Sequence, residues 1–193
     1  MAVKMDNEIT VRVICSDEDL LKQLREKGFK EGRKFTLDDY YFVPKNIDIS
    51  KLSVREVLSK AIIIRYIVDS GKVFQTISFK FKDINEAGEI VNQKAINCNI
   101  YSIEEAKKLF EAIGYYEIMN IKESDIIYYQ NDFELAIKFI KNSNTLIEIE
   151  TDSKYDTIDK LINKVKEIKL PIEENNYFVK KAEEELIKIL KVN

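Results

Sequence analysis

Polar and hydrophobic residues alternate strictly from residue 8 to residue 13, which predicts a β-strand. Side chains of a strand point alternately to its two faces, so one face is apolar. That face carries Ile9, Val11 and Val13. The other face presents an acid, a hydroxyl and a base in a row: Glu8, Thr10 and Arg12.

Four later predicted strands repeat this arrangement, with charged or polar residues two positions apart. They carry Arg65; Ser78, Lys80 and Lys82; Glu134 and Lys138; and Glu148 and Glu150. On alternation alone, the wet face of a half-open sheet is the simpler interpretation. The alternative is that these faces converge inside a barrel. Arg and Lys would then bind phosphate oxygens there, and carboxylates would hold a divalent cation.

Two predicted helices share the same start and stop signals. Ser16 caps a helix that ends at Gly28, and Ser102 caps a helix that ends at Gly114. Each helix is preceded and followed by an extended stretch, and a shift of 86 residues, about half the chain, aligns the two copies. We therefore predict an internal repeat over roughly residues 8–45 and 94–131.

The whole pattern contains about eight strands and no long crossover helix, which favours antiparallel pairing. The predicted fold is α+β: a closed eight-stranded antiparallel β-barrel, or tunnel, built from two similar halves with flanking helices. The expected strands include 35–43, 61–68, 73–81, 90–101, 124–129, 133–140 and 146–150. C-terminal helices are expected within 155–190, over 157–168 and 176–190, and residues 1–193 are expected to form a single domain.

Composition narrows the function classes. Net charge is −3 and opposite charges are intermixed, so no basic field for nucleic acid is expected. No apolar run approaches the ~18 residues of a membrane span, and no signal peptide is evident. Cys15 and Cys98 lie in apolar strand patterns and are expected to be reduced core residues of a cytoplasmic protein. Histidine is absent, which removes imidazole catalysis and His metal sites.

The order of these motifs resembles the CYTH superfamily, the triphosphate tunnel metalloenzymes. The resemblance covers roughly residues 5–190 and rests on E-x-T-x-R at residue 8, two helices ending in Gly-aromatic, YYF at 40, IIIR at 62, FKFK at 79 and LIEIE at 146. It implies a class IV adenylyl cyclase-like or thiamine triphosphatase-like protein. Such proteins bind a triphosphate in a tunnel together with Mg²⁺ or Mn²⁺.

Carried over by motif, the resemblance assigns metal and phosphate roles but no catalytic residue. It implies metal binding by Glu8, Glu148 and Glu150, and phosphate binding by Arg12, Arg65, Lys80, Lys82 and Lys122. Some positions depart from the family pattern: Thr10 and Lys138 stand where acids are usual, and Ser124 stands where Arg is usual. The site is therefore expected to be partly degenerate.

Three functions stay open at this point. The first is a metal-dependent enzyme that cyclises or hydrolyses a nucleoside or thiamine triphosphate. The second is a degenerate tunnel that binds a phosphorylated ligand without turnover. The third is a structural or protein-interaction domain with a polar interior. The expected partner is a small-molecule triphosphate or other polyphosphate, with no nucleic acid and no membrane, and a homodimer is left open.

Overall fold

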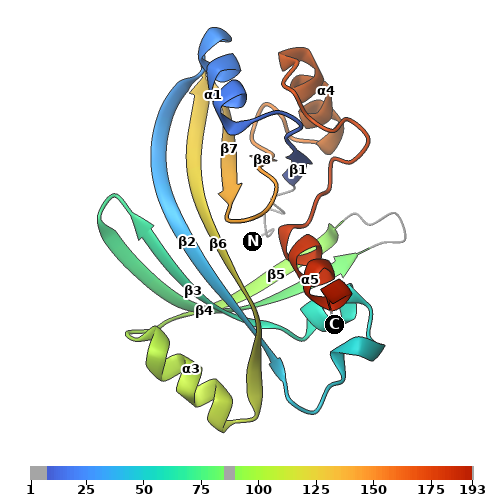
Figure 1. The fold of residues 1–193 in the computed structure, drawn as a ribbon. Helices are drawn as coiled ribbons and strands as arrows, with labels where there is room; N and C mark the ends of the chain where they lie inside the picture. The colour runs from blue at the N-terminus through green and yellow to red at the C-terminus, as the bar shows by residue number, and fades with distance from the viewer. Residues whose placement is uncertain (1–7, 85–89, 193) are drawn as a thin grey trace. The chain divides into compact units, whose positions relative to one another are not determined.

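The computed structural model describes residues 8–84 and 90–192 and contains one eight-stranded sheet in the order β1-β8-β7-β6-β2-β3-β4-β5 (Figure 1). The neighbouring strands whose register is known all pair antiparallel. The strands are β1 (Glu8–Arg12), β2 (Lys30–Pro44), β3 (Ile62–Asp69), β4 (Lys72–Ile84), β5 (Ile90–Asn99), β6 (Tyr115–Gln130), β7 (Phe133–Ile140) and β8 (Leu146–Glu150). The antiparallel α+β architecture predicted from the sequence is therefore confirmed.

Closure of the sheet into a barrel is not seen. Within residues 8–84 and 90–192, β1 and β5 lie at opposite ends of the strand order and are not paired with each other. The outer edge of β1 is instead bonded to the extended segment 171–179. The Thr10 N–H donates to the Tyr177 carbonyl over 2.9 Å, and the Val179 N–H donates to the Thr10 carbonyl over 3.0 Å. Because backbone groups at the outer edge of β1 form hydrogen bonds with this segment, that edge is paired without β5.

Among the described residues, five α-helices and one short 3₁₀ helix accompany the sheet. They are α1 (Asp17–Glu26), η1 (Ile49–Lys51), α2 (Val54–Ser59), α3 (Ile103–Ala112), α4 (Ile158–Ile168) and α5 (Lys181–Val192). The Ser16 hydroxyl accepts the Asp19 N–H at the start of α1, and the Ser102 hydroxyl accepts the Glu105 N–H at the start of α3. Gly28 and Gly114 follow these two helices with φ of 83° and 89°. Both helices thus start and stop in the way that the predicted internal repeat requires, and the repeat itself stays a prediction.

The chain divides into two compact units, and each is described here by itself. Unit 1 comprises Met1–Lys34 and Ser124–Val179, and unit 2 comprises Phe35–Glu123 and Lys180–Asn193. Neither unit is a continuous stretch, so β2 and β6 each contribute residues to both.

In unit 1, the apolar faces of β1, β7 and β8 pack under α1 and α4. Ile9, Val11 and Ile147 are fully buried in this core together with side chains from both helices. The helical contributions come from Leu20, Leu24, Leu161 and Val165. The helices therefore cover one face of these strands, and the residues at alternate positions lie on the other face.

In unit 2, α3 covers the apolar face of the central strands. Phe110 of α3 lies edge-on against Phe42 of β2, with ring centroids 5.4 Å apart, and Ile64 of β3 completes the cluster. The opposite face of the same strands carries Asp39, Arg65 and Thr76 in one cross-strand row. Each unit therefore has one apolar face under helices and one polar face.

Some element bounds differ from those expected. β6 begins at Tyr115, nine residues before the predicted start, and α5 begins at Lys181 rather than residue 176. Residues 177–179 are extended because they bond to Thr10 instead of starting the helix. Cys98 is exposed, not buried, because it lies on β5 at the edge of the sheet. Of the described residues, none forms a helix long and apolar enough to cross a bilayer.

Candidate functional site

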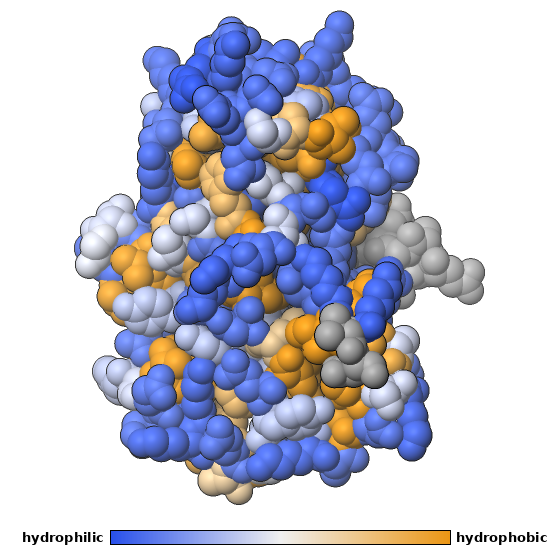
Figure 2. Space-filling view, viewed as in Figure 1, coloured by the Kyte–Doolittle hydropathy of each residue, from blue (hydrophilic) through white to orange (hydrophobic). Residues whose placement is uncertain are grey.

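The polar faces of the two units are where charged side chains gather. On the face shown in Figure 2, hydrophilic residues make up most of the surface and hydrophobic residues form smaller patches between them.

The polar face of unit 1 is ordered by strand register. Glu8 of β1 lies opposite Glu150 of β8, and Thr10 lies opposite Glu148. Partners directly across an antiparallel pair point to the same face, so these four side chains share it. The pairing follows from the sequence, because any slip by one residue would turn Ile9 and Val11 out of the core.

Three glutamates converge on this face. Glu8, Glu148 and Glu150 each offer a carboxylate oxygen, and these oxygens lie within 4.8 Å of one another. Oxygen ligands about 2.0–2.6 Å from a common Mg²⁺ or Ca²⁺ ion can be at most roughly 4.0–5.2 Å apart, a range that includes this distance. The three residues therefore fit an oxygen-ligated divalent cation. They are the same three residues that the sequence assigns to metal binding.

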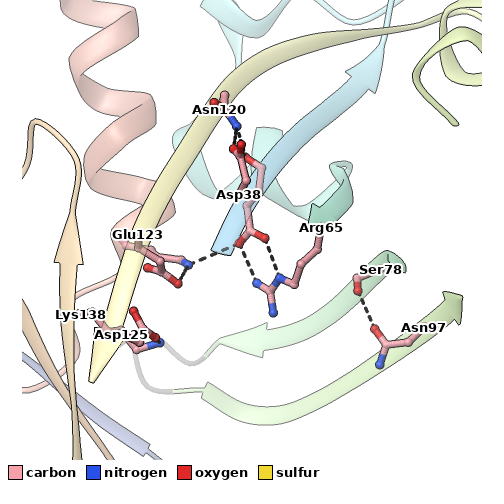
Figure 3. Close-up of polar contacts among 10 residues, drawn as sticks. Asp38, Arg65, Ser78, Asn97, Asn120, Glu123, Asp125 and Lys138 are labelled. Atoms are coloured by element: carbon pink, nitrogen blue, oxygen red, sulfur yellow. Dashed lines mark hydrogen bonds and ion pairs between the residues drawn. The ribbon is translucent and has the colours of Figure 1, made fainter. Parts of the chain in front are cut away.

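Lys138 of β7 enters the same group of acids. Its Nζ lies 3.7 Å from Asp125 Oδ2 on β6 (Figure 3). The same Nζ lies 3.0 Å from Glu148 Oε1. Asp125 is almost fully buried, and a buried carboxylate is costly unless a cation or hydrogen bonds compensate it. Lys138 therefore supplies positive charge between two acids of this face.

Arg12 ends the polar row of β1. Its guanidinium forms an ion pair with Glu173 Oε2, and both side chains are partly exposed. Glu173 also donates its backbone N–H to the Arg12 carbonyl. Arg12 thus lies in the same unit as the three glutamates, and its side chain is held by the segment that covers β1.

A second charged cluster lies in unit 2, around Asp39 of β2. Arg65 of β3 donates to both carboxylate oxygens of Asp39, over 2.6 and 2.7 Å (Figure 3). Burial of Asp39 raises its pKa, but the Arg65 hydrogen bonds and nearby positive charge outweigh this and leave the pKa below its usual range. Arg65 is thereby held as one half of a bidentate ion pair.

Lys181, the first residue of α5, extends this cluster. Its ammonium lies 2.6 Å from Glu123 Oε1 of β6 and 3.4 Å from Asp39 Oδ2. Burial lowers the pKa of Lys181, but Asp39 and Glu123 more than offset this and raise it overall. Glu123 Oε2 is also buried and accepts no hydrogen bond from the described residues. Two acids and two bases thus fix the start of α5 to β2, β3 and β6.

The remaining predicted phosphate ligands lie in unit 2 in different settings. Lys80 of β4 shares the face of Arg65, and its charge contributes to lowering the pKa of Asp39. Lys122 is half-exposed on β6, on the face opposite Glu123, and pairs with Asp38 over 3.1 Å. The side chain of Lys82 lies outside the part of the chain that the structure describes. Arg65 and Lys80 are therefore on one face, and Lys122 is on the other.

Four charged residues of these clusters are absent from the sequence-based assignment: Asp39, Glu123, Asp125 and Lys181. A signal for the two β6 acids exists in the sequence. Met119 and Ile121 are buried at alternating positions, and Glu123 and Asp125 continue the same phase. The predicted repeat also aligns Asp39 with Asp125, and both are buried. Lys181 had no such signal, because the start of α5 was expected earlier.

Comparison with known proteins gives structural matches only. Neither a family model nor a curated protein matches the sequence. A solved protein from Pyrococcus horikoshii OT3 is 19% identical, with TM-score 0.69 over 95% of this chain and 99% of that one. A candidate adenylate cyclase from Vibrio parahaemolyticus is 14% identical, with TM-score 0.59 over 95% and 97%. A candidate adenylyl cyclase from Hippeastrum with a dominant triphosphatase activity is 13% identical, with TM-score 0.58 over 97% and 96%. This chain shares the fold of these structures over nearly its whole length.

Proposed function

We propose that this protein binds a triphosphate-containing small molecule together with one or more divalent cations and acts as a triphosphate tunnel metalloenzyme of the CYTH type. The observation that carries the proposal is the convergence of Glu8, Glu148 and Glu150 to within 4.8 Å. The shared fold supports it, because two of the similar structures are candidate adenylyl cyclases and one of these has triphosphatase activity.

In the proposed reaction, Glu8, Glu148 and Glu150 would hold Mg²⁺ or Mn²⁺. When bound, the cation supplies positive charge to phosphate oxygens and to the leaving group. Arg12 lies in the same unit as these glutamates and is positioned by Glu173. It would donate hydrogen bonds to phosphate oxygens of the ligand. Phosphate binding by Arg65, Lys80, Lys82 and Lys122 remains a prediction from the sequence.

Two reactions are compatible with this site. In cyclisation, the ribose 3′-hydroxyl attacks the α-phosphorus of a nucleoside triphosphate, and pyrophosphate leaves. In hydrolysis, water attacks the terminal phosphorus, the bond from that phosphorus to the bridging oxygen breaks, and the diphosphate leaves as inorganic phosphate is formed. Both need charge stabilisation more than covalent chemistry, which suits a chain without histidine.

A second candidate is a protein that binds a phosphorylated ligand without turning it over. The contact of Lys138 with Glu148 favours it, because an ammonium beside a metal-binding carboxylate weakens the hold on a divalent cation. Ligand binding would then persist when the metal is removed.

The test is turnover of ATP, thiamine triphosphate and inorganic triphosphate with Mg²⁺ or Mn²⁺, following cyclic nucleotide, pyrophosphate and phosphate. We expect product with at least one substrate, abolished by EDTA. Glu148→Gln should weaken metal binding at least about tenfold, because it removes an anionic ligand. The matched control is Glu167→Gln, on the exposed part of α4 in the same unit. Absence of product with all three substrates, combined with EDTA-resistant binding of inorganic triphosphate, would favour the second candidate instead.

A further inference from the structure

The position of Lys138 among the acids of unit 1 bears on how many cations this face can take. Its ammonium contacts Glu148 on one strand and Asp125 on another, at 3.0 and 3.7 Å. Only 13% of the Lys138 side chain and 1% of the Asp125 side chain are exposed. A cation in this setting is shielded from solvent and is held by two carboxylates at once.

Asp125 and Glu148 would otherwise offer a divalent ion two carboxylates from different strands, since they lie 3.7 and 3.0 Å from the same Lys138 ammonium. The Lys138 ammonium already lies between them. A divalent ion placed between these two acids would stand within a few ångströms of that ammonium, and the two positive charges would repel each other with little screening.

We infer that Lys138 takes the place of a second divalent cation between Asp125 and Glu148, so that this face binds a single divalent ion at Glu8, Glu148 and Glu150. This rests on the proposed function, in which those three glutamates hold the metal. Glu148 is then shared, with one carboxylate facing both Lys138 and the ion. Lys138 acts as a specificity-determining residue that sets the number of metal ions.

Counting Mn²⁺ ions bound to the purified protein tests this without measuring activity. The free Mn²⁺ signal in electron paramagnetic resonance gives the number of equivalents bound. We expect one equivalent for the wild type and for Lys138→Arg, which keeps the positive charge. Lys138→Met should bind one equivalent more than the wild type, and Asp125→Asn combined with Lys138→Met should return to the wild-type number.

The decisive quantity is the difference between Lys138→Met and the wild type. A gain of one equivalent supports the inference, and no gain overturns it. A wild type that binds two equivalents overturns it as well, and this measurement does not depend on any variant folding. Lys138→Gln, whose amide can still donate to Asp125, is measured in parallel because Lys138→Met leaves that buried acid without its ammonium.

Failure of the proposed function has a different signature. A wild type that binds no Mn²⁺ contradicts metal binding by the three glutamates. The inference, which rests on that ion, then fails with it. A wild type that binds one equivalent, together with a Lys138→Met variant that gains none, contradicts the inference alone. Lys154→Met serves as the control in the same unit, because Lys154 is exposed and pairs with Asp132 over 2.7 Å. It should leave the Mn²⁺ count unchanged.

Discussion

Three acids, Asp39, Glu123 and Asp125, are buried on the central strands β2 and β6, and each contacts a base from another element. For Asp39 the base is Arg65, which donates to both carboxylate oxygens. Removing one partner of such a pair leaves a buried charge uncompensated, whereas removing both leaves none. Loss of a base that pairs with a buried acid is therefore expected to lower the free energy of unfolding far more than loss of a base in an exposed pair.

Arg65→Met should lower the free energy of unfolding by about 3 kcal/mol, because buried Asp39 loses its bidentate partner. Lys122→Met removes the half-exposed pair with Asp38 and should cost less than about 1 kcal/mol. Urea denaturation of both variants provides the measurement. Equal losses in the two variants would show that the Arg65 contact contributes no more than a surface ion pair.

Stability should also depend on pH through Asp39. Its folded-state pKa is lowered, so it contributes stability above the unfolded value of about 3.9, and that contribution is lost as pH falls through the folded pKa. The free energy of unfolding of Asp39→Asn should therefore differ most from that of the wild type at pH 5–7, and this difference should become smaller below about pH 4. Denaturation curves at several pH values measure it. Asp159→Asn removes an exposed acid of α4, and its difference in unfolding free energy from the wild type should not change in this way with pH. A pH-independent difference between Asp39→Asn and the wild type would contradict the lowered pKa of Asp39.

Capping serines and glycine stops largely explain why the sequence predicts these helices well. The signals at Ser16 and Ser102 are local, and both hydroxyls accept the expected N–H. Strand β8 was likewise predicted with the bounds observed. The start of α5 was missed because residues 177–179 are set by bonds to Thr10, far away in sequence. Local patterns cannot report such contacts.

Ser102→Ala should destabilise unit 2 by about 1 kcal/mol, because the Glu105 N–H at the start of α3 loses its acceptor. Glu111→Ala, on the exposed side of the same helix, should change stability by no more than about 0.5 kcal/mol. Thermal unfolding of both variants provides the comparison. A Ser102→Ala protein as stable as the Glu111→Ala protein would mean that water caps the helix equally well.

The whole molecule combines two compact units, each built from separate stretches of the chain. The single domain expected over residues 1–193 stays a prediction. Strand alternation and the repeat predict a closed sheet, which the structure does not show, because both are blind to which distant segments pack together. The convergence of Glu8, Glu148 and Glu150 agrees with the sequence pattern, because all three lie on short strands with clear alternation; metal binding by them stays a prediction. The buried partners Lys138, Lys181 and Glu123 could not be paired by pattern, because each pair joins residues brought together only by folding.

Deleting residues 180–193 should destabilise unit 2 more than unit 1. The deletion removes Lys181 and leaves buried Asp39 and Glu123 without its ammonium, whereas the segment bonded to β1 ends at Val179. Hydrogen exchange should therefore show faster exchange of β2 and β3 amides in residues 35–69, with β1 and β8 amides still protected. Lys181→Met should reproduce part of this effect. Uniform loss of protection in both units would contradict it.

The backbone bonding of β1 also sets an order on folding during synthesis. β1 is made first, but its partners on the two sides, β8 and the segment 171–179, are made more than a hundred residues later. At ribosomal rates of about 5–20 residues per second, the nascent strand waits many seconds with its backbone unpaired. Its alternating Ile9, Val11 and Val13 are exposed throughout that time. Binding of a chaperone to this stretch on the ribosome is the expected consequence.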